Sequence, residues 1–226
     1  MIITIDGPAG TGKSSVAQEV ARRLGYDFLD TGAMYRAIGL AAVRAGVSLD
    51  DAEALGALAE KVSVDFDWSI QPPSVRLDGE VVADLIRTEA ASNAASKVAV
   101  VPRVREAMVR LQQEVGQVRP DLVTEGRDQG TVVFPRAGMK IYLDAAAHER
   151  AKRRQLQFEA KGETVNFDKL LAQICERDAR DSGRTHSPLC AADDACVIDT
   201  TSLSQEEVTQ RIVELSLERI RGRCSR

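Results

Sequence analysis

A glycine-rich loop between an apolar segment and a helical segment constrains this chain more than any other feature. Residues 7 to 14 read Gly-Pro-Ala-Gly-Thr-Gly-Lys-Ser and match the pattern G-x-x-x-x-G-K-[ST] in full. Before the loop, residues 2 to 5 form a β-branched run typical of a strand buried on both faces. After it, apolar residues recur at helical spacing as far as Leu24. This order of strand, loop and helix predicts a P-loop fold that binds the phosphates of a nucleoside triphosphate.

The residue types of the loop suit this chemistry. Glycines let backbone N–H groups converge on phosphate oxygens, and the helix N-terminus adds a partial positive charge. Lys13 can bridge to the transferred group and Ser14 can reach Mg²⁺, while Ser15 leaves open which hydroxyl faces the ion. We therefore expect ATP as co-substrate and Mg²⁺ as cofactor. The expected binding residues are Gly7, Pro8, Ala9, Gly10, Thr11, Gly12, Lys13, Ser14 and Ser15.

Further short apolar runs alternate with helical segments along the chain, which predicts an α/β fold with a five-stranded parallel sheet between helices. Asp50 is a suitable N-cap for a helix over 51–61. Ser204 and Glu207 form a capping-box pattern before the last helix. The four strands expected after the first are 27–30, 122–125, 140–143 and 196–199.

Residues 62–118 depart from this pattern. Apolar and polar residues alternate from Val62 to Trp68, and two apolar runs meet across Asp78-Gly79, a hairpin signal. We expect a small antiparallel sheet here, in a subdomain inserted into a core made of 1–61 and 119–226.

The charge and residue content exclude several classes of protein. The chain has 226 residues and a net charge of −4, which argues against a nucleic acid polymer as partner. Its two histidines make a histidine-based metal site or triad hard to assemble. No apolar run is long enough to span a membrane, and four cysteines without C-x-x-C spacing are typical of cytosolic thiols. We expect a cytoplasmic monomer.

Local concentrations of arginine predict an acceptor that carries phosphate. An alcohol acceptor would need a carboxylate base, whereas a phosphate monoester would need cations to overcome repulsion between two anions. Arg36 follows the second expected strand and Arg127 the third, where parallel sheets place their ligands. The bland alternative for each cluster is a solvated helix face with ion pairs. Two further clusters have helical spacing: Arg150, Arg153 and Arg154, and Arg177 with Asp181 and Arg184.

Five segments together resemble the bacterial cytidylate kinases, which phosphorylate CMP and dCMP. The resemblance covers nearly the whole chain and implies a five-stranded core, a mobile helical lid at about 150–184 and an enlarged monophosphate-binding insertion. It also implies in-line transfer of the γ-phosphoryl group from ATP. The segments are 3–14, 29–36, 93–96 with 102–105, 125–134, and 177–181.

The resemblance also assigns roles to single residues. The positions that hold the phosphate of CMP are Arg36, Arg127 and Arg184. Those that read the cytosine are Ser96, Arg105 and Asp128. Contacts to the ribose fall on Arg177 and Asp181, and the second-strand motif adds Thr31 and Tyr35 to the substrate site. The catalytic positions are Lys13, Arg154 and Arg184, with Arg154 on the lid. Glu125 is a candidate to support Mg²⁺ without touching it.

Two alternatives remain at this point. A P-loop kinase for another acceptor, such as UMP or a metabolite alcohol, would share the loop and the core. An ATP-binding regulatory module would need only the loop and would leave the arginine clusters without a function.

Overall fold

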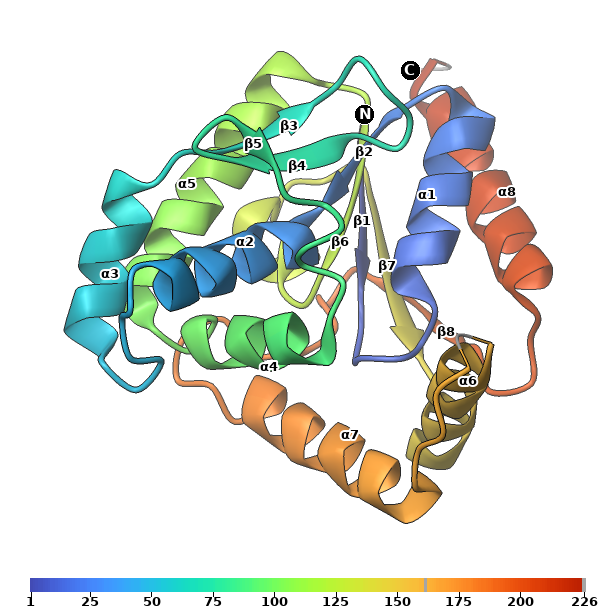
Figure 1. The fold of residues 1–226 in the computed structure, drawn as a ribbon. Helices are drawn as coiled ribbons and strands as arrows, with labels where there is room; N and C mark the ends of the chain where they lie inside the picture. Colours follow the sequence, from blue (N-terminus) through green and yellow to red (C-terminus); the bar gives the residue numbers. More distant parts are fainter. Residues whose placement is uncertain (161, 225–226) are drawn as a thin grey trace. The chain divides into compact units, whose positions relative to one another are not determined.

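The computed structural model describes residues 1–160 and 162–224, and these form two compact units (Figure 1). The first joins Met1–Asp27 with Asp121–Arg226, and the second is Phe28–Pro120. The predicted insertion, 62–118, lies within the second unit. That unit also takes in residues 28–61 because two helices from this segment pack against two helices that follow the hairpin.

The main sheet has five strands in the order β2-β6-β1-β7-β8. Strand β1 pairs parallel with β6 and β7, and β7 pairs parallel with β8. The α/β fold and the five predicted strands are therefore confirmed. Their bounds are β1 Ile2–Asp6, β2 Asp27–Asp30, β6 Leu122–Gly126, β7 Met139–Asp144 and β8 Cys196–Asp199.

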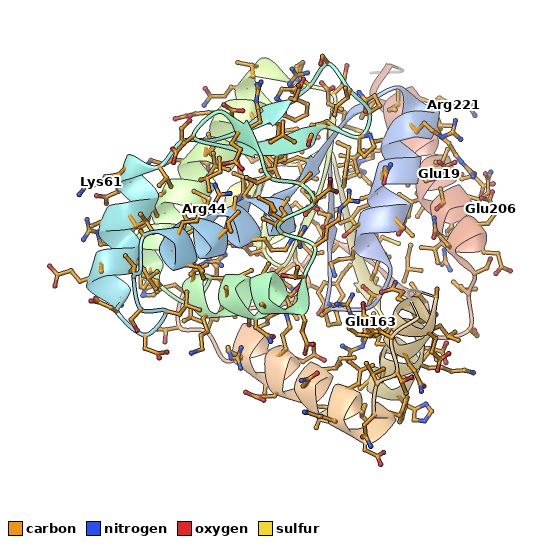
Figure 2. The ribbon with its side chains drawn as sticks, in the orientation of Figure 1. Glu19, Arg44, Lys61, Glu163, Glu206 and Arg221 are labelled. Carbon is orange, nitrogen blue, oxygen red and sulfur yellow. The ribbon has the colours of Figure 1, made fainter. Side chains whose placement is uncertain are left out.

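Apolar side chains of β1, β6, β7 and β8 and of the flanking helices form the core of the first unit. Ile3, Ile5 and Ile141 are fully buried, as expected of strands covered on both faces. Helices α1 (Lys13–Leu24) and α8 (Gln205–Cys224) lie side by side in Figure 1. Figure 2 labels Glu19 on α1 and Glu206 on α8, and the guanidinium of Arg23 donates to both carboxylates.

Two helices of the first unit fall in the range predicted for the lid. Helix α6 (Ala147–Glu159) packs against α7 (Phe167–Ser182) around a small apolar cluster of its own. Ala151, Leu170 and Ile174 are the buried members of that cluster. Residue 161, within the predicted lid, lies outside the described residues.

The second unit contains the predicted antiparallel sheet, in the order β3-β4-β5. Its hairpin turns at Asp78 and Gly79, both with positive φ (50° and 82°). The unit's strands are β3 Val64–Asp67, β4 Ser74–Leu77 and β5 Glu80–Val81. Its helices are α2 Thr31–Arg44, α3 Ala52–Lys61, α4 Glu89–Val98 and α5 Pro102–Val118.

The helix caps agree with the sequence in one case and differ in another. The capping box is confirmed, since the Glu207 N–H donates to Ser204 Oγ and the Ser204 N–H donates to Glu207 Oε2. Asp50 was the wrong N-cap, because Asp51 accepts from the Ala54 N–H at 3.0 Å and begins α3 one residue later. No helix in the described part of the chain is long and apolar enough to cross a bilayer.

Candidate active site

The glycine-rich loop follows β1 directly and is held by close backbone contacts. Gly7 has φ of +146°, and a Cβ at this position would lie 2.0 Å from the carbonyl oxygen of Leu143 on β7. A side chain therefore cannot be accommodated at the start of the loop without moving the sheet. At the other end of the loop, Gly12 precedes the first turn of α1. The predicted order of strand, loop and helix N-terminus is thus present, with free backbone N–H groups expected at the helix start.

Lys13 is buried beneath this loop. Its Nζ donates to the carbonyl oxygen of Pro8 at 2.7 Å, and only 5% of the residue is exposed. Burial, reinforced by the positive charge of Arg127, lowers the pKa of Lys13 to about 7. An anion beside Nζ favours the charged form, so a bound triphosphate would stabilise the positive charge of this side chain.

Ser14 faces an acidic side chain at the end of β6. Its hydroxyl donates to Glu125 Oε1 at 2.8 Å, which pairs the two residues that the sequence proposed near the metal. The pairing also distinguishes the two adjacent serines, since it is the Ser14 hydroxyl that contacts Glu125. A hydroxyl and a carboxylate together form an all-oxygen donor set, the type that Mg²⁺ prefers.

Two of the arginines predicted to hold the phosphate, Arg127 and Arg184, and one predicted at the ribose, Arg177, converge on Asp181, which is 1% exposed. Arg127 Nε donates to Asp181 Oδ2 at 3.0 Å, and Arg184 Nη2 pairs with Asp181 Oδ1. Arg177 Nε lies 4.0 Å from Asp181 Oδ2. Helix α7 ends at Ser182, so Arg184 reaches the carboxylate from beyond the helix end.

This cluster shifts the proton affinity of its members. Burial alone would raise the pKa of Asp181, but Arg127, Arg184 and Arg177 outweigh it and lower that pKa below its usual value. Burial likewise works against the charge of Arg127, yet Asp181 and Glu125 raise the pKa of its guanidinium. Asp181 and Arg127 therefore stay charged at neutral pH. With the guanidinium groups of Arg177 and Arg184, the cluster carries a net positive charge suited to an anion.

The three arginines of α6 lie in different surroundings. Arg150 is buried: its Nη1 donates to the Ala9 carbonyl at 3.0 Å and its Nη2 pairs with Asp178 Oδ2 at 2.6 Å. Arg153 donates to the main-chain and side-chain oxygens of Thr200. Arg154 instead bonds Gln157 on its own helix at 3.3 Å. Arg150 thus holds the main chain of the glycine loop, and Arg154 is the α6 arginine with the fewest constraints on its reorientation.

In the second unit, the residues assigned to the substrate gather around α2. Asp30 caps α2 through the Ala33 N–H and also accepts from Arg36 Nη2 at 2.8 Å, which orients this arginine. The Arg105 guanidinium lies over the ring of Tyr35, 5.6 Å from its centre. The substrate-assigned residues that are almost fully buried in this unit are Thr31, Tyr35, Ser96 and Arg105.

The structure adds one residue that the sequence reasoning missed, Asp6 at the end of β1. Its two carboxylate oxygens accept from the Gln129 and Gly130 N–H groups at 2.9 and 2.7 Å. These residues begin η1 (Gln129–Val133), a single turn of π-helix directly after Arg127 and Asp128. The sequence offered one indication of this role. Asp6 is an acidic residue at the end of a strand that is otherwise apolar except for one threonine.

Comparison with known proteins decides between the alternatives left by the sequence. The sequence model of the family named Cytidylate kinase matches residues 3–218. The chain belongs to the cytidylate kinase family. It is 50% identical over 215 residues to a cytidylate kinase of Shewanella denitrificans, covering 94% of each chain. It is 49% identical over 212 residues to a cytidylate kinase of Aeromonas salmonicida, covering 94% of this chain and 92% of that one.

Solved structures are similar to this cytidylate kinase family member at the level of the fold. An uncharacterized protein from Eubacterium ventriosum matches with a TM-score of 0.50 and 12% sequence identity, over 95% of this chain and 97% of that chain. Within the described residues, no group of three or more His, Cys, Asp or Glu side chains could hold a metal by itself.

Proposed function

We propose that this member of the cytidylate kinase family transfers the γ-phosphoryl group of ATP to CMP or dCMP and releases CDP or dCDP. The observation that carries the proposal is the family match over residues 3–218, together with relatives named cytidylate kinase at about half identity. ATP is the co-substrate, as the family implies, and it would bind at the loop between β1 and α1. Catalysis then consists of positioning and electrostatic stabilisation, because phosphoryl transfer needs little covalent chemistry from the protein.

On the ATP side, the loop residues Gly7 to Ser15 would hold the phosphates through backbone N–H groups, with Lys13 at the transferred group. Mg²⁺ is the metal that the oxygen donors fit, with the Ser14 hydroxyl as a ligand and Glu125 accepting from it. Bound Mg²⁺ would supply charge neutralisation on the phosphates. The Ser14–Glu125 hydrogen bond orients the serine oxygen for that role.

On the acceptor side, a monophosphate needs cations that are already fixed in place. The hydrogen bonds of Arg127 and Arg184 to Asp181 supply this order, and Arg36 is fixed in the same way by Asp30. Each guanidinium keeps N–H groups that its carboxylate does not use, and these can donate to phosphate oxygens. Arg177 and Asp181 would contact the ribose in addition.

The base would be read by polar side chains that are almost fully buried, namely Ser96, Arg105 and Asp128. Cytosine offers an amino donor at N4 and acceptors at N3 and O2, which match a carboxylate or hydroxyl acceptor and a guanidinium donor. Uracil would leave buried polar groups unpaired, and such mismatches can cost several kcal/mol, about a thousandfold in specificity. Thr31 and Tyr35 would complete the substrate site.

The α6–α7 pair would act as the lid. Closure over the nucleotides would exclude water and bring Arg154 to the transferred phosphoryl group, which limits wasteful hydrolysis of ATP. The state of association as a monomer and the cytoplasmic location stay predictions from the sequence.

A panel of acceptors tests the function. Purified protein with ATP and Mg²⁺ is assayed against CMP, dCMP, UMP and simple metabolite alcohols, and kcat/KM is compared. We expect turnover with CMP or dCMP to exceed that with UMP by about a hundredfold or more. Preference for UMP or for an alcohol would identify a different kinase, and no turnover despite ATP binding would identify a regulatory module.

Two variants assign the residues in the same assay. Lys13→Ala should abolish transfer to every acceptor, because the loop loses its charge at the transferred group. Asp128→Ala should reduce kcat/KM for CMP by about tenfold or more and for UMP much less, since only the cytosine contact is removed. Asp193→Ala removes an exposed aspartate of the same unit and is the matched control. Equal losses with CMP and UMP would refute the base-reading role of Asp128.

A further inference from the structure

We propose that Asp6 is a positioning residue for the acceptor: its carboxylate fixes the η1 turn and thereby places Arg127 and Asp128. The inference rests on the proposed function, since it takes Arg127 and Asp128 to be acceptor-binding residues. It adds a role for a side chain that contacts neither nucleotide in the proposal. It also connects the start of the ATP-binding loop to the start of the acceptor-binding turn through one side chain.

The hydrogen bonds of Asp6 use both oxygens of the carboxylate. Gln129 donates its backbone N–H to Oδ1 at 2.9 Å, and Gly130 donates to Oδ2 at 2.7 Å. Only 4% of Asp6 is exposed, so water does not replace these bonds readily. Two neighbouring backbone N–H groups received by one carboxylate fix both the position and the direction of the main chain there.

The η1 turn needs an acceptor from outside because the N–H groups of its first residues have no carbonyl within the turn to donate to. The first bonds inside the turn are donated by Val132 and Val133 to the Asp128 carbonyl, and by Phe134 to the Gln129 carbonyl. N–H groups in the first turn of any helix lack partners within that helix. Asp6 supplies the missing acceptors for Gln129 and Gly130, which immediately follow Asp128.

A second contact, from Thr124 on β6, fixes Gln129. Thr124 Oγ1 lies 2.9 Å from Gln129 Oε1 in a buried hydrogen bond. Gln129 is therefore held through its main chain by β1 and through its side chain by β6. Asp128 and Arg127, the two preceding residues, have little freedom to move independently of the sheet.

Asp6 is itself held firmly at the end of β1. It lies opposite Gly126 on β6 and opposite Tyr142 on β7 in the parallel sheet. The next residue is Gly7, whose Cα faces the Leu143 carbonyl without room for a side chain. A carboxylate on such a rigid strand can hold a turn in one place, which is the requirement for a positioning residue.

The charge state of Asp6 agrees with a hydrogen-bonding role. Burial raises the pKa of this carboxyl to about 7, the two backbone hydrogen bonds oppose that shift, Asp128 adds to it and Lys13 opposes it. A buried carboxylate with such a disfavoured charge is costly, so its retention requires a compensating contact. The two backbone N–H groups offset part of that cost, and burial still keeps the pKa raised.

The variant that tests the inference is Asp6→Asn. It keeps the shape of the side chain but replaces one acceptor oxygen by an NH₂ group, which cannot accept from a backbone N–H. We expect KM for CMP to rise about tenfold or more and the preference for CMP over UMP to fall. KM for ATP should change by less than about threefold, because the loop itself is not altered.

Thr4→Val is the matched control. Thr4 lies two residues earlier on the same face of β1 and is fully buried, and its hydroxyl finds no hydrogen-bond partner among the residues that the structure describes. Removing this hydroxyl at nearly constant volume should leave both KM values unchanged. Thermal melts of both variants, with and without ATP, report whether each protein is folded.

Gly130→Ala changes the residue that donates to Asp6, and so tests the same contact from the turn. It replaces Asp6→Asn as the test if that variant does not fold. A Cβ at Gly130 would lie 3.0 Å from Thr4 Oγ1 and 3.4 Å from Asp6 Oδ2, so it pushes the turn away from β1. We expect the same selective rise in KM for CMP. A variant with wild-type kinetics would overturn the inference.

Two other results would also overturn it. If Asp6→Asn raises KM for ATP as much as KM for CMP, then Asp6 acts on the loop or on Lys13 and does not position the acceptor. If Arg127→Ala and Asp128→Ala leave the kinetics with CMP unchanged, the acceptor assignment itself fails, and the inference fails with it. If those two variants are impaired while Asp6→Asn is normal, the assignment stands and only the role of Asp6 is refuted.

Discussion

Two buried carboxylates of the first unit, Asp6 at the end of β1 and Asp181 near the end of α7, have opposite electrostatic surroundings. Both are at most 4% exposed. Asp6 meets backbone N–H groups, and burial raises its pKa to about 7. Asp181 meets three guanidinium groups, which outweigh burial and lower its pKa.

The difference shows that burial alone does not decide what a carboxylate does. Partial charges on two N–H groups fix geometry at Asp6 but do not offset the cost of burying its charge. Full charges on Arg127, Arg177 and Arg184 offset that cost at Asp181, and Asp181 in turn holds the arginines in a fixed arrangement. Asp6 thus mainly fixes the main-chain geometry of a turn, whereas Asp181 mainly balances and positions the charges of three arginines.

The largest expected effect comes from breaking the charged region. Asp181→Ala leaves three arginines without their shared carboxylate, and removing one partner of a buried pair costs about 3–5 kcal/mol. We expect the melting temperature to fall by at least roughly 6 °C and kcat/KM for CMP to fall about tenfold or more. Differential scanning calorimetry and the coupled kinase assay measure the two effects.

Glu176→Ala is the matched control for this variant, since it removes an acidic side chain from the same helix. Glu176 pairs with Arg180 at 2.7 Å, but its side chain is 72% exposed. The melting temperature of Glu176→Ala should equal that of the wild type. A wild-type melting temperature for Asp181→Ala would show that the arginines do not need the carboxylate, and the contrast with Asp6 would lose its basis.

The pH dependence of stability sharpens the same comparison, because the two carboxyls should contribute with opposite sign. The folded pKa of Asp181 lies below its ordinary value of 3.8, so its contribution is present above about pH 4 and is lost as the pH falls further. The folded pKa of Asp6 lies near 7, so its contribution favours folding at about pH 4 and is lost as the pH rises to about 7.

Melting curves of the wild type, Asp6→Asn and Asp181→Asn between pH 3 and pH 8 would test this. Above about pH 4 the wild type should have a higher melting temperature than Asp181→Asn, and this difference should shrink as the pH falls below about 4. Relative to Asp6→Asn, the wild type should lose stability as the pH rises from about 4 to 7. Parallel curves for all three proteins would contradict the assignment of opposite shifts.

The smallest effect is expected from ion pairs on the surface of the second unit. Arg103 Nη2 lies 2.8 Å from Glu60 Oε2, a separation as short as those around Asp181, but both side chains are about half exposed. Solvent screening and side-chain entropy cancel most of the attraction. Glu60→Gln should therefore melt within the scatter of repeated wild-type measurements, and a clear loss would mean that exposure is a poor guide to the value of these pairs.

Features encoded by neighbouring residues were predictable from the sequence. The glycine loop, the Asp78-Gly79 hairpin and the Ser204–Glu207 capping box each depend on contacts within a few positions. The inner strands β1 and β6 were predictable because burial on both faces favours a largely apolar run. Even so, the choice between Asp50 and Asp51 as N-cap needed the structure, because both are aspartates at suitable positions before the helix.

Contacts between distant segments were not predictable in the same way. Asp6 and its two partners are 123 and 124 residues apart, and nothing in either segment alone indicates the other. Arg150 has the spacing of a lid arginine, yet it donates to the loop at Ala9, 141 residues earlier. The substrate roles of Ser96, Arg105 and Asp128 came from resemblance to a family and stay predictions until the variants are assayed.

The way in which Asp6 holds the η1 turn has a consequence for changing what the enzyme accepts. Its two hydrogen bonds go to the main chain of Gln129 and Gly130, and not to any side chain of the turn. A new residue at Asp128 would therefore leave this attachment intact. Evolution or an engineer could rewrite the base preference at this position while the scaffold that presents it stays the same, whereas Arg127 is also bound to the buried Asp181.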